Sequence, residues 1–395
     1  DIVDYTSAGV VINCYGGVSS LFQGVGSYSF ITTTTNSLNL YVNNAGDGSL
    51  VGSIDNVSVK EYLGQEVVPE SGCGSWLWEP QSTNLITYSE TFSDSFYVKD
   101  SGVVVGAKNN ISPSGNANAT KIDVTNNGRI YANIATNTYY TSVFIKSGTF
   151  SHFKFAGSNV NLIAETNANG SIQKFSNGWY RISLSYTGNR PFQIQAYPDG
   201  TYSSHTTSGN YYIWGAQAET LPFVSSYIPA TSGSTVTRNQ DVCTNGGSLA
   251  SINSTEGVLY AEIAALADDL TSRGLSISDG TSSNACRIYY INSSNRIRFF
   301  FNVGGNAQVI KTIDLTNITD YNKIAFSYKQ DDFKIYINGL KVDEDTSGIV
   351  PSANTFNKLS FDRGYGGENF FGKTKAVAVW KEALSDEELT ELTTI

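Results

Sequence analysis

The sequence has few of the residues on which catalytic and metal sites are usually built. Its 395 residues include two histidines, four cysteines and no methionine. Neither His152 nor His205 lies in a recognisable nucleophile motif, and no CxxC pair occurs, so a zinc site is not expected. One or two disulfides are possible, but we expect mostly free, buried thiols. The cysteines are Cys14, Cys73, Cys243 and Cys286.

Charged residues are also sparse, and they are mainly negative. Asp, Glu, Lys and Arg make up 15% of the chain, and the net charge is −10. Such a charge disfavours a nucleic-acid backbone or an anionic membrane as partner. No run of about 18 apolar residues occurs, so membrane insertion is not expected. Because methionine is absent, we expect Asp1 to follow an upstream segment, and the chain to be part of a longer protein.

Aromatic and turn-forming residues dominate instead. The chain contains 24 Tyr, 20 Phe and 37 Gly. Many short alternating segments separated by Gly, Ser, Thr and Asn are typical of an all-β protein. In Tyr180–Tyr186 and Phe192–Tyr197, every second residue is apolar or aromatic. This period predicts half-buried strands of a β-sandwich, each with one solvated face.

The last sixty residues read as one folding unit. Asp332–Val342 alternates and turns at Asn338-Gly339, which predicts a tight hairpin, and Phe370–Trp380 predicts a buried strand. A short helix is expected near Leu384–Leu392. There Ser385 and Glu388 form a capping-box pattern, and Leu384 with Leu389 forms a hydrophobic staple.

These C-terminal motifs resemble a known domain. The segments YINGLKV (336–342), GGENFFGKTKAVAVW (366–380) and ALSDEELTELT (383–393) are similar to the concanavalin A-like lectin/LamG sandwich of phage and prophage structural proteins. The resemblance covers residues 238–395.

The middle of the chain resembles a second module. The segments EPQSTNLITYSETF (79–92), GWYRISLSY (178–186) and YYIWGAQAE (211–219) are similar to a carbohydrate-binding-module-like jelly roll of phage tail and fibre proteins. IDNVSVKEY (54–62) resembles the last strand of another jelly roll. We expect the first half of this jelly roll to be missing, cleaved or supplied by another chain.

We therefore expect an all-β fold of tandem β-sandwiches. The domains are a partial jelly roll with linker (1–66), a complete carbohydrate-binding-type jelly roll (67–237), and a concanavalin A-like/LamG sandwich with a short C-terminal helix (238–395). The linker is expected over Leu63–Gly74. Trp76 and Trp78 are expected to pack between domains.

The resemblance implies a non-enzymatic phage virion protein, a fibre or appendage that binds host-surface glycans. The expected partners are glycans and other virion subunits or copies of itself, as in a trimer. A purely structural virion building block or capsid decoration protein is one alternative. A polysaccharide depolymerase is another, but it needs paired carboxylates facing the substrate. Val258–Ile263 offers Glu262 alone, and the adjacent Asp268 and Asp269 would point apart.

Two regions combine the side chains that sugar binding uses. Gln193, Gln195 and Tyr197 form a polar-aromatic row, and Arg181 is expected on an adjacent strand. The loop over 362–369 contributes its own set, namely Asp362, Tyr365 and Asn369. The alternatives are an ordinary solvated sheet face and a polar connection. We expect Trp179 and Trp214 to pack in or beside the core.

Calcium is a possible cofactor, because it is common in such modules. Asp279, Asp343 and Asp345 offer carboxylate oxygens. Neither the turn around Asp279 nor the run 343–345 has the spacing of a calcium loop. The alternative is a set of solvated turns.

Overall fold

The structure is a computed structural model that describes residues 73–395, apart from the side chains of Cys73 and Ser176. Before residue 73 it describes the backbone of six strands. These are β1 (Ile2–Ser7), β2 (Val10–Cys14), β3 (Ser20–Phe22), β4 (Leu40–Asn44), β5 (Val51–Ile54) and β6 (Val67–Glu70).

Residues 1–66 form a unit of their own. In it β1 pairs with β5, and β3, β2 and β4 form a second small sheet. The last strand of a jelly roll, expected over 54–62, lies outside the described residues apart from Ile54, which ends β5. The partial jelly roll stays a prediction.

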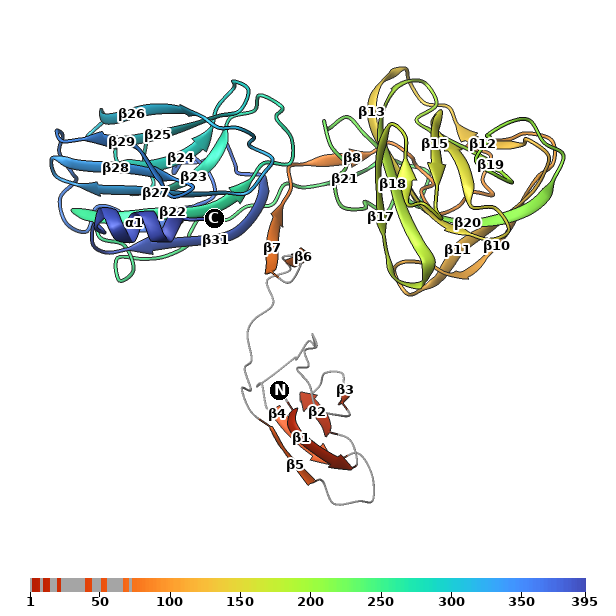
Figure 1. Ribbon diagram of the computed structural model, residues 1–395, viewed down its shortest axis with the longest axis horizontal. Helices are drawn as coiled ribbons and strands as arrows, with labels where there is room; N and C mark the ends of the chain where they lie inside the picture. Colours follow the sequence, from red (N-terminus) through yellow and green to blue (C-terminus); the bar gives the residue numbers. More distant parts are fainter. Residues whose placement is uncertain are drawn as a thin grey trace. The chain divides into compact units, whose positions relative to one another are not determined.

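Residues 82–238 form a sandwich of two six-stranded sheets, the central sandwich (Figure 1). We name the sheets after the strands that matter most below. The β18 sheet has the order β10 (Val103–Ile111), β11 (Ala117–Thr125), β20 (Ser208–Glu219), β13 (Asn137–Ser147), β18 (Trp179–Gly188) and β17 (Gly170–Lys174). The β19 sheet has the order β16 (Thr166–Asn167), β15 (Ser158–Asn161), β14 (His152–Phe155), β19 (Phe192–Tyr197), β12 (Arg129–Ala132) and β9 (Tyr97–Lys99). Strands β8 (Ser82–Asn84) and β21 (Val236–Arg238) form a small ladder beside them.

The core of the central sandwich follows the predicted alternation. Ile182 and Leu184 from one sheet pack with Phe192 and Ile194 from the other, and all four are buried. The residues between them face outward, so along these two strands buried positions alternate with more exposed ones. This confirms the half-buried strands expected from the sequence.

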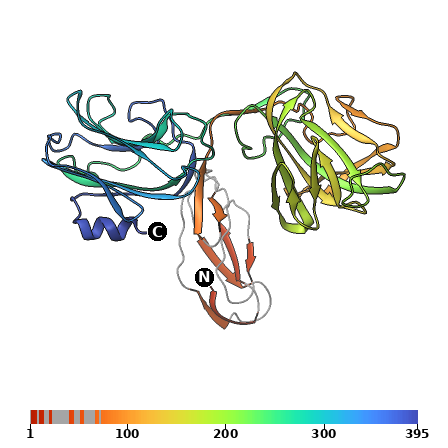
Figure 2. The same ribbon diagram turned by 45° about the horizontal axis from the view of Figure 1, so that its top comes forward.

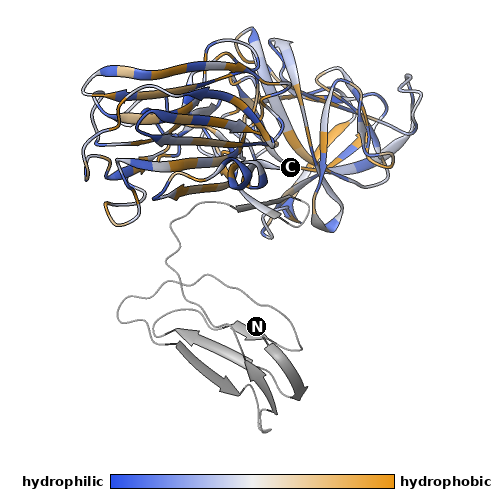
Figure 3. Ribbon diagram, turned by 60° about the vertical axis from the view of Figure 1, so that its left-hand side comes forward, coloured by the Kyte–Doolittle hydropathy of each residue, from blue (hydrophilic) through white to orange (hydrophobic). Residues whose placement is uncertain are grey.

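The C-terminal sandwich consists of a seven-stranded and a five-stranded sheet. The larger sheet has the order β29 (Leu340–Asp345), β28 (Asp332–Ile337), β27 (Asn322–Lys329), β22 (Glu256–Ala264), β31 (Gly372–Trp380), β7 (Cys73–Trp78) and β6. The smaller one has the order β26 (Asn306–Asp314), β25 (Arg296–Val303), β24 (Ala285–Tyr290), β23 (Arg273–Ser278) and β30 (Lys358–Ser360). Figure 3 shows hydrophobic and hydrophilic residues alternating along these strands.

The C-terminal helix and hairpin form as the sequence predicts. Helix α1 (Asp386–Thr393) begins at a capping box made by Ser385 and Glu388. It lies on the outer face of the seven-stranded sheet (Figure 2), where Leu384 and Leu389 join one hydrophobic cluster. Asn338 and Gly339 connect β28 to β29 with φ angles of 51° and 81°, the positive values that a tight hairpin turn requires.

The segment before the central sandwich departs from expectation. Part of the predicted linker, together with both tryptophans, forms the hairpin β6–β7, and β7 pairs with β31 of the C-terminal sandwich. Trp78 is 2% exposed and stacks on Phe361 at 4.2 Å, inside the core of that sandwich. Trp76 is 46% exposed. Residues 67–78 thus belong to the C-terminal sheet rather than to the jelly roll, because Trp78 fills a place in that core.

The fold is all-β, with tandem β-sandwiches. Of the described cysteines, Cys243 and Cys286 are free, while the side chains of Cys14 and Cys73 lie outside the described residues. Burial raises the pKa of the Cys286 thiol well above its ordinary value. Within the described part of the chain, no helix has the length and apolarity to cross a membrane.

Candidate functional site

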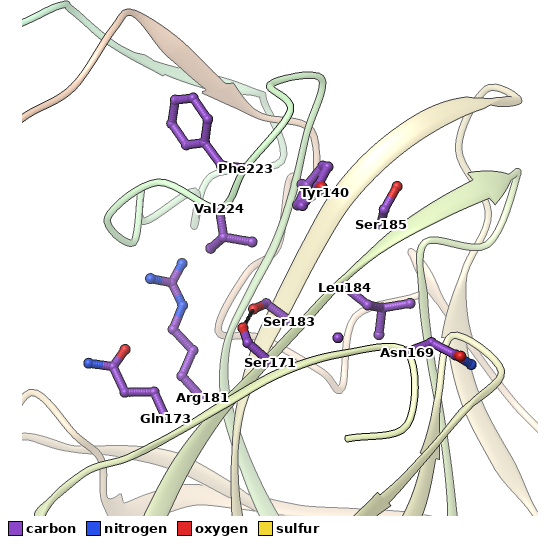
Figure 4. A pocket seen from close by; sticks show the side chains of 11 residues that line it. Tyr140, Asn169, Ser171, Gln173, Arg181, Ser183, Leu184, Ser185, Phe223 and Val224 are labelled. Atoms are coloured by element: carbon purple, nitrogen blue, oxygen red, sulfur yellow. Dashed lines mark hydrogen bonds between the residues drawn. The ribbon is translucent and has the colours of Figure 1, made fainter. Parts of the chain in front are cut away.

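A groove of about 410 Å³ lies on the outer face of the β18 sheet (Figure 4). Its floor comes from β13, β17 and β18, and one wall comes from the segment after β20. The lining is mainly polar, with two aromatic rings. It consists of Tyr140, Asn169, Gly170, Ser171, Gln173, Arg181, Ser183, Leu184, Ser185, Phe223 and Val224.

Strand register brings the polar side chains of the floor together. Arg181, Ser183 and Ser185 alternate with core residues along β18, so they project outward. Strand β17 places Gln173 opposite Arg181 and Ser171 opposite Ser183. The Ser171 and Ser183 hydroxyls are 2.7 Å apart and hydrogen-bonded (Figure 4). The result is a ladder of hydroxyl and amide groups.

The wall is held by a buried carboxylate. Glu219 is fully buried at the end of β20 and accepts hydrogen bonds from Ser82 Oγ at 2.5 Å, Gln217 Nε2 at 2.6 Å and Ser225 N at 3.1 Å. Gln217 Oε1 in turn accepts from Ile228 N at 2.7 Å. Buried polar networks in which each member has partners hold their surroundings rigidly. This network therefore clamps residues 220–228, which we call the polar cover, onto the sheet.

Arg181 joins the floor to the polar cover. Its Nη2 donates to Ser225 O at 2.7 Å and to Ser142 Oγ at 3.0 Å, and its Nε donates to Ser142 Oγ at 3.3 Å. The guanidinium also lies 5.4 Å from the centre of the Phe144 ring. Burial lowers the pKa of Arg181 to about 10, although the charges of Glu219 and Glu79 partly offset this shift. Arg181 is thus a desolvated cation with a fixed orientation.

The groove has the composition of a binding site for a polar ligand. Its volume falls in the range of about 300–1,000 Å³ that is usual for small-molecule sites. Tyr140 supplies aromatic surface, whereas Phe223 is only 8% exposed, and the hydroxyl, amide and guanidinium groups supply hydrogen bonds. Among the described residues that line it, none is a histidine, cysteine or carboxylate. The side chains present can bind a polar ligand through hydrogen bonds and apolar contact.

The row predicted from the sequence lies on the other sheet. Gln193, Gln195 and Tyr197 project from the outer face of β19. Arg181 is not among their neighbours, because β18 pairs with β13 and β17, whereas β19 pairs with β12 and β14. The structure thus separates the predicted set into two faces.

The two ends of this row differ. Gln195 donates to Asn127 O at 2.8 Å, while Gln193 is partly exposed and opposite Tyr131. Tyr197 is only 3% exposed, with the Tyr202 ring 5.5 Å away and Lys154 Nζ 5.2 Å away. Tyr197 is therefore packed, and the two glutamines remain the accessible part of the row.

In the C-terminal loop, one of the three predicted residues is well exposed. Asp362 is 3% exposed and accepts a hydrogen bond from Gly364 N at 2.6 Å, so it shapes the loop. Asn369 bridges to Gly274 on β23. Tyr365 is 42% exposed and stacks with Arg363, whose guanidinium lies 4.5 Å from the ring centre.

The three candidate calcium ligands do not converge. Asp279 accepts hydrogen bonds from Thr281 and Asn284, which outweigh the effect of burial and lower the pKa of its carboxyl. Asp343 pairs with Lys311, and Asp345 accepts from Ser347. In the part of the chain that the structure describes, no three His, Cys, Asp or Glu side chains gather as a metal site. Calcium binding stays a prediction.

The carboxylates considered for hydrolysis have structural partners. Glu262 lies 3.8 Å from Lys375. Asp268 accepts from Ser294 Oγ and Asn295 N, and Asp269 pairs with the buried Arg273. Each therefore stabilises a local feature of the C-terminal sandwich.

The tryptophans of the central sandwich pack as expected. Trp179 and Trp214 are both buried in one cluster with Phe144. Trp179 Nε1 donates to Ile111 O at 3.1 Å.

The groove was not identified from the sequence as a site. The outward position of Arg181 was visible in the alternation of β18, and Ser171 and Gln173 alternate with Ile172 in the same way. The wall has no such period, because it depends on contacts between Glu219 and residues from β8 and the polar cover.

Comparison with known proteins finds one family model that matches the C-terminal part. Residues 262–390 match the concanavalin A-like lectin/glucanases superfamily. No curated protein sequence matches the chain. Similar solved structures include the leech intramolecular trans-sialidase, with 18% identity and a TM-score of 0.30, covering 36% of this chain and 23% of that one.

Two further solved structures are carbohydrate-binding or laminin modules. The CBM40 of the Ruminococcus gnavus IT-sialidase has 16% identity and a TM-score of 0.30, covering 36% of this chain and 84% of that one. Mouse laminin α1 domains LG4-5 have 8% identity and a TM-score of 0.26, covering 81% and 96%. At these low scores we transfer no residue role from them.

Proposed function

We propose that the chain is a non-enzymatic glycan-binding protein and that the groove on the β18 sheet is its binding site. The groove itself carries the proposal. It sets a ladder of hydroxyl and amide groups beside the ring of Tyr140. Sugar rings offer hydroxyls for such a ladder and apolar C–H faces for aromatic side chains. The superfamily match of residues 262–390 supports a lectin-like protein.

We further propose that the protein is a fibre or appendage of a phage virion that attaches to glycans on a host surface. This setting rests on the motif resemblances across residues 67–395. Its partners would then be host glycans and other virion subunits or copies of itself, and a homo-oligomer such as a trimer is expected. Light scattering with intact mass spectrometry tests the assembly, and a monomer would contradict it.

The binding proposal is tested with the whole chain against a panel of soluble neutral and acidic polysaccharides, by affinity electrophoresis and calorimetry. Tyr140→Ala is expected to weaken binding about 10-fold, since a ring stacked on a ligand contributes on the order of 1 kcal/mol. Gln193→Ala, on the opposite sheet, is the matched control and should bind like the unmodified chain.

The outcomes separate the alternatives. Loss of binding in Gln193→Ala alone would move the site to the row on β19. Absence of binding to every polysaccharide would refute the glycan-binding proposal and favour the purely structural role. Release of oligosaccharides during incubation would contradict the non-enzymatic part.

A further inference from the structure

The charge of the groove is one-sided. Arg181 is the only charged side chain among the described residues that line it. The chain as a whole has a net charge of −10, so a site with a lone cation and no lining carboxylate stands out from the rest of the surface. Since like charges repel and opposite charges attract at close range, such a site discriminates between anionic and cationic ligands.

Arg181 retains hydrogen-bonding capacity. A guanidinium has five N–H donors, of which two belong to Nη1. Nε and Nη2 donate to Ser142 and Ser225, whereas Nη1 makes no hydrogen bond to the described residues. Figure 4 shows the guanidinium extending past Gln173 toward Val224 at the wall of the groove. The donors of Nη1 are therefore the ones available to a ligand.

The nearest buried carboxylate does not use up these donors. Both oxygens of Glu219 accept hydrogen bonds from Ser82, Gln217 and Ser225, and no direct ion pair joins Glu219 to Arg181 in the described part of the chain. Arg181, which is half-buried, therefore has no hydrogen-bonded anion among the described residues, although the charges of Glu219 and Glu79 act on it. A carboxylate that entered the groove would form a charge-assisted hydrogen bond, which is stronger than one between neutral groups.

We propose that the groove selects acidic glycans, with the carboxylate of a uronic acid or sialic acid unit bound at Nη1 of Arg181. This proposal rests on the groove being the glycan site. The hydroxyls of Ser171, Ser183 and Ser185 and the amide of Gln173 then meet the hydroxyls of the same sugar. The sugar carboxylate is the chemistry that the two kinds of acidic unit share.

The decisive test uses the unmodified chain and pairs of glycans that differ only in charge. One pair is an oligogalacturonate and its carboxyl-reduced, neutral counterpart, and the other is sialyllactose and its carboxyl-reduced, neutral counterpart. Titration calorimetry at low salt is expected to give about 10- to 100-fold tighter binding to at least one acidic member, the factor that a hydrogen bond to a charged group contributes. The pair that shows the difference identifies the source of the carboxylate.

Two substitutions assign the effect to Arg181. Arg181→Gln is expected to remove the preference for the acidic member. Arg190→Gln is the matched control, because Arg190 stacks on Tyr131 of the β19 sheet, 4.3 Å from the ring centre, and its loss changes the net charge equally. Hydrogen exchange of residues 220–228 shows whether the polar cover stays in place in Arg181→Gln. If it opens, the comparison of charged and neutral glycans on the unmodified chain still decides.

Equal binding of acidic and neutral members, or binding of neutral glycans alone, would overturn the acidic preference while leaving glycan binding intact. An equal loss of preference in Arg190→Gln would overturn the assignment to Arg181. No binding of any glycan would instead refute the proposed function on which the inference rests.

Discussion

The two sandwiches each cover part of an outer sheet face, but with different chemistry. In the central sandwich the polar cover combines a hydrogen-bond network of Glu219, Gln217 and Ser225 with packing of Tyr227 on Trp214, 4.5 Å between ring centres. In the C-terminal sandwich α1 packs through Leu389 into a cluster that contains Tyr260 and other apolar residues. Apolar contact is non-directional and seals a face. A polar network is directional, so at its edge it leaves oriented donors such as those of Arg181 beside open space. The difference explains why the groove lies next to the polar cover.

Removing the carboxylate of the polar cover is the largest expected perturbation. Glu219→Ala leaves the buried donors of Ser82, Gln217 and Ser225 without their acceptor, and each unpaired buried donor costs about 1–3 kcal/mol. We expect a loss of roughly 3–5 kcal/mol in the central sandwich and loss of glycan binding. Hydrogen exchange of β18 and β20 amides measures the stability, and calorimetry measures binding.

The matched control for this substitution is Thr220→Ala, an exposed change in the same segment. It should alter stability by less than about 0.5 kcal/mol. If Glu219→Ala kept both the exchange protection and the binding, the polar cover would not depend on this carboxylate.

Helix α1, which we call the apolar cover, is expected to lose less stability when its packing is perturbed, and glycan binding should not change. Leu389→Ala removes a fully buried side chain between α1 and the seven-stranded sheet. Large-to-small core substitutions of this kind cost about 2–5 kcal/mol, and a short terminal helix can relax, so we expect about 2 kcal/mol. Exchange of α1 and β27 amides should speed up, while glycan binding by the central sandwich stays unchanged.

Glu391→Ala, an exposed change on the same helix, serves as the control. Weaker glycan binding in Leu389→Ala but not in Glu391→Ala would contradict the comparison, because it would mean that the apolar cover also supports the ligand site.

Local sequence signals predicted the local structure well. The capping box at Ser385 and Glu388, the turn at Asn338-Gly339 and the alternation along β18 each depend on residues close in sequence, and each is confirmed. Their physical causes, helix capping, positive φ and one-sided burial, act over a few residues.

Features that depend on distant pairing could not be read in this way. Trp78 was expected between domains, yet it lies in the C-terminal core because β7 pairs with β31, nearly 300 residues later in the chain. Arg181 was joined to Gln193 and Gln195 because all three project outward from nearby strands, but those strands belong to different sheets. Alternation shows on which face of a strand a side chain lies, but it does not show which strands are its neighbours in the sheet. Because the groove depends on both the face and the neighbours of each strand, it was found only in the structure.

The smallest effect expected concerns the charges that attach the start of α1. The Asp386 carboxylate lies 2.9 Å from Lys341 Nζ and 3.1 Å from Lys334 Nζ, and these lysines also contact Glu344 and Asp332. Hydrogen bonds from Lys341 and then Lys334 hold the pKa of Asp386 below its ordinary value of 3.8. A carboxyl with a lowered folded pKa contributes stability that is present above 3.8 and is lost as the pH falls through the folded value.

The protection of α1 amides against hydrogen exchange should therefore decline as the pH drops below about 4, once the intrinsic exchange rate is corrected for. The decline should be modest, because exposed ion pairs contribute little stability. Asp386→Asn should reduce this decline, and the remainder belongs to Glu388, whose pKa is also lowered by hydrogen bonds from Ser385. Glu387→Gln, which removes the same charge from the same turn, should leave it in place, and an identical pH profile in both variants would assign the effect to the net charge of the helix instead.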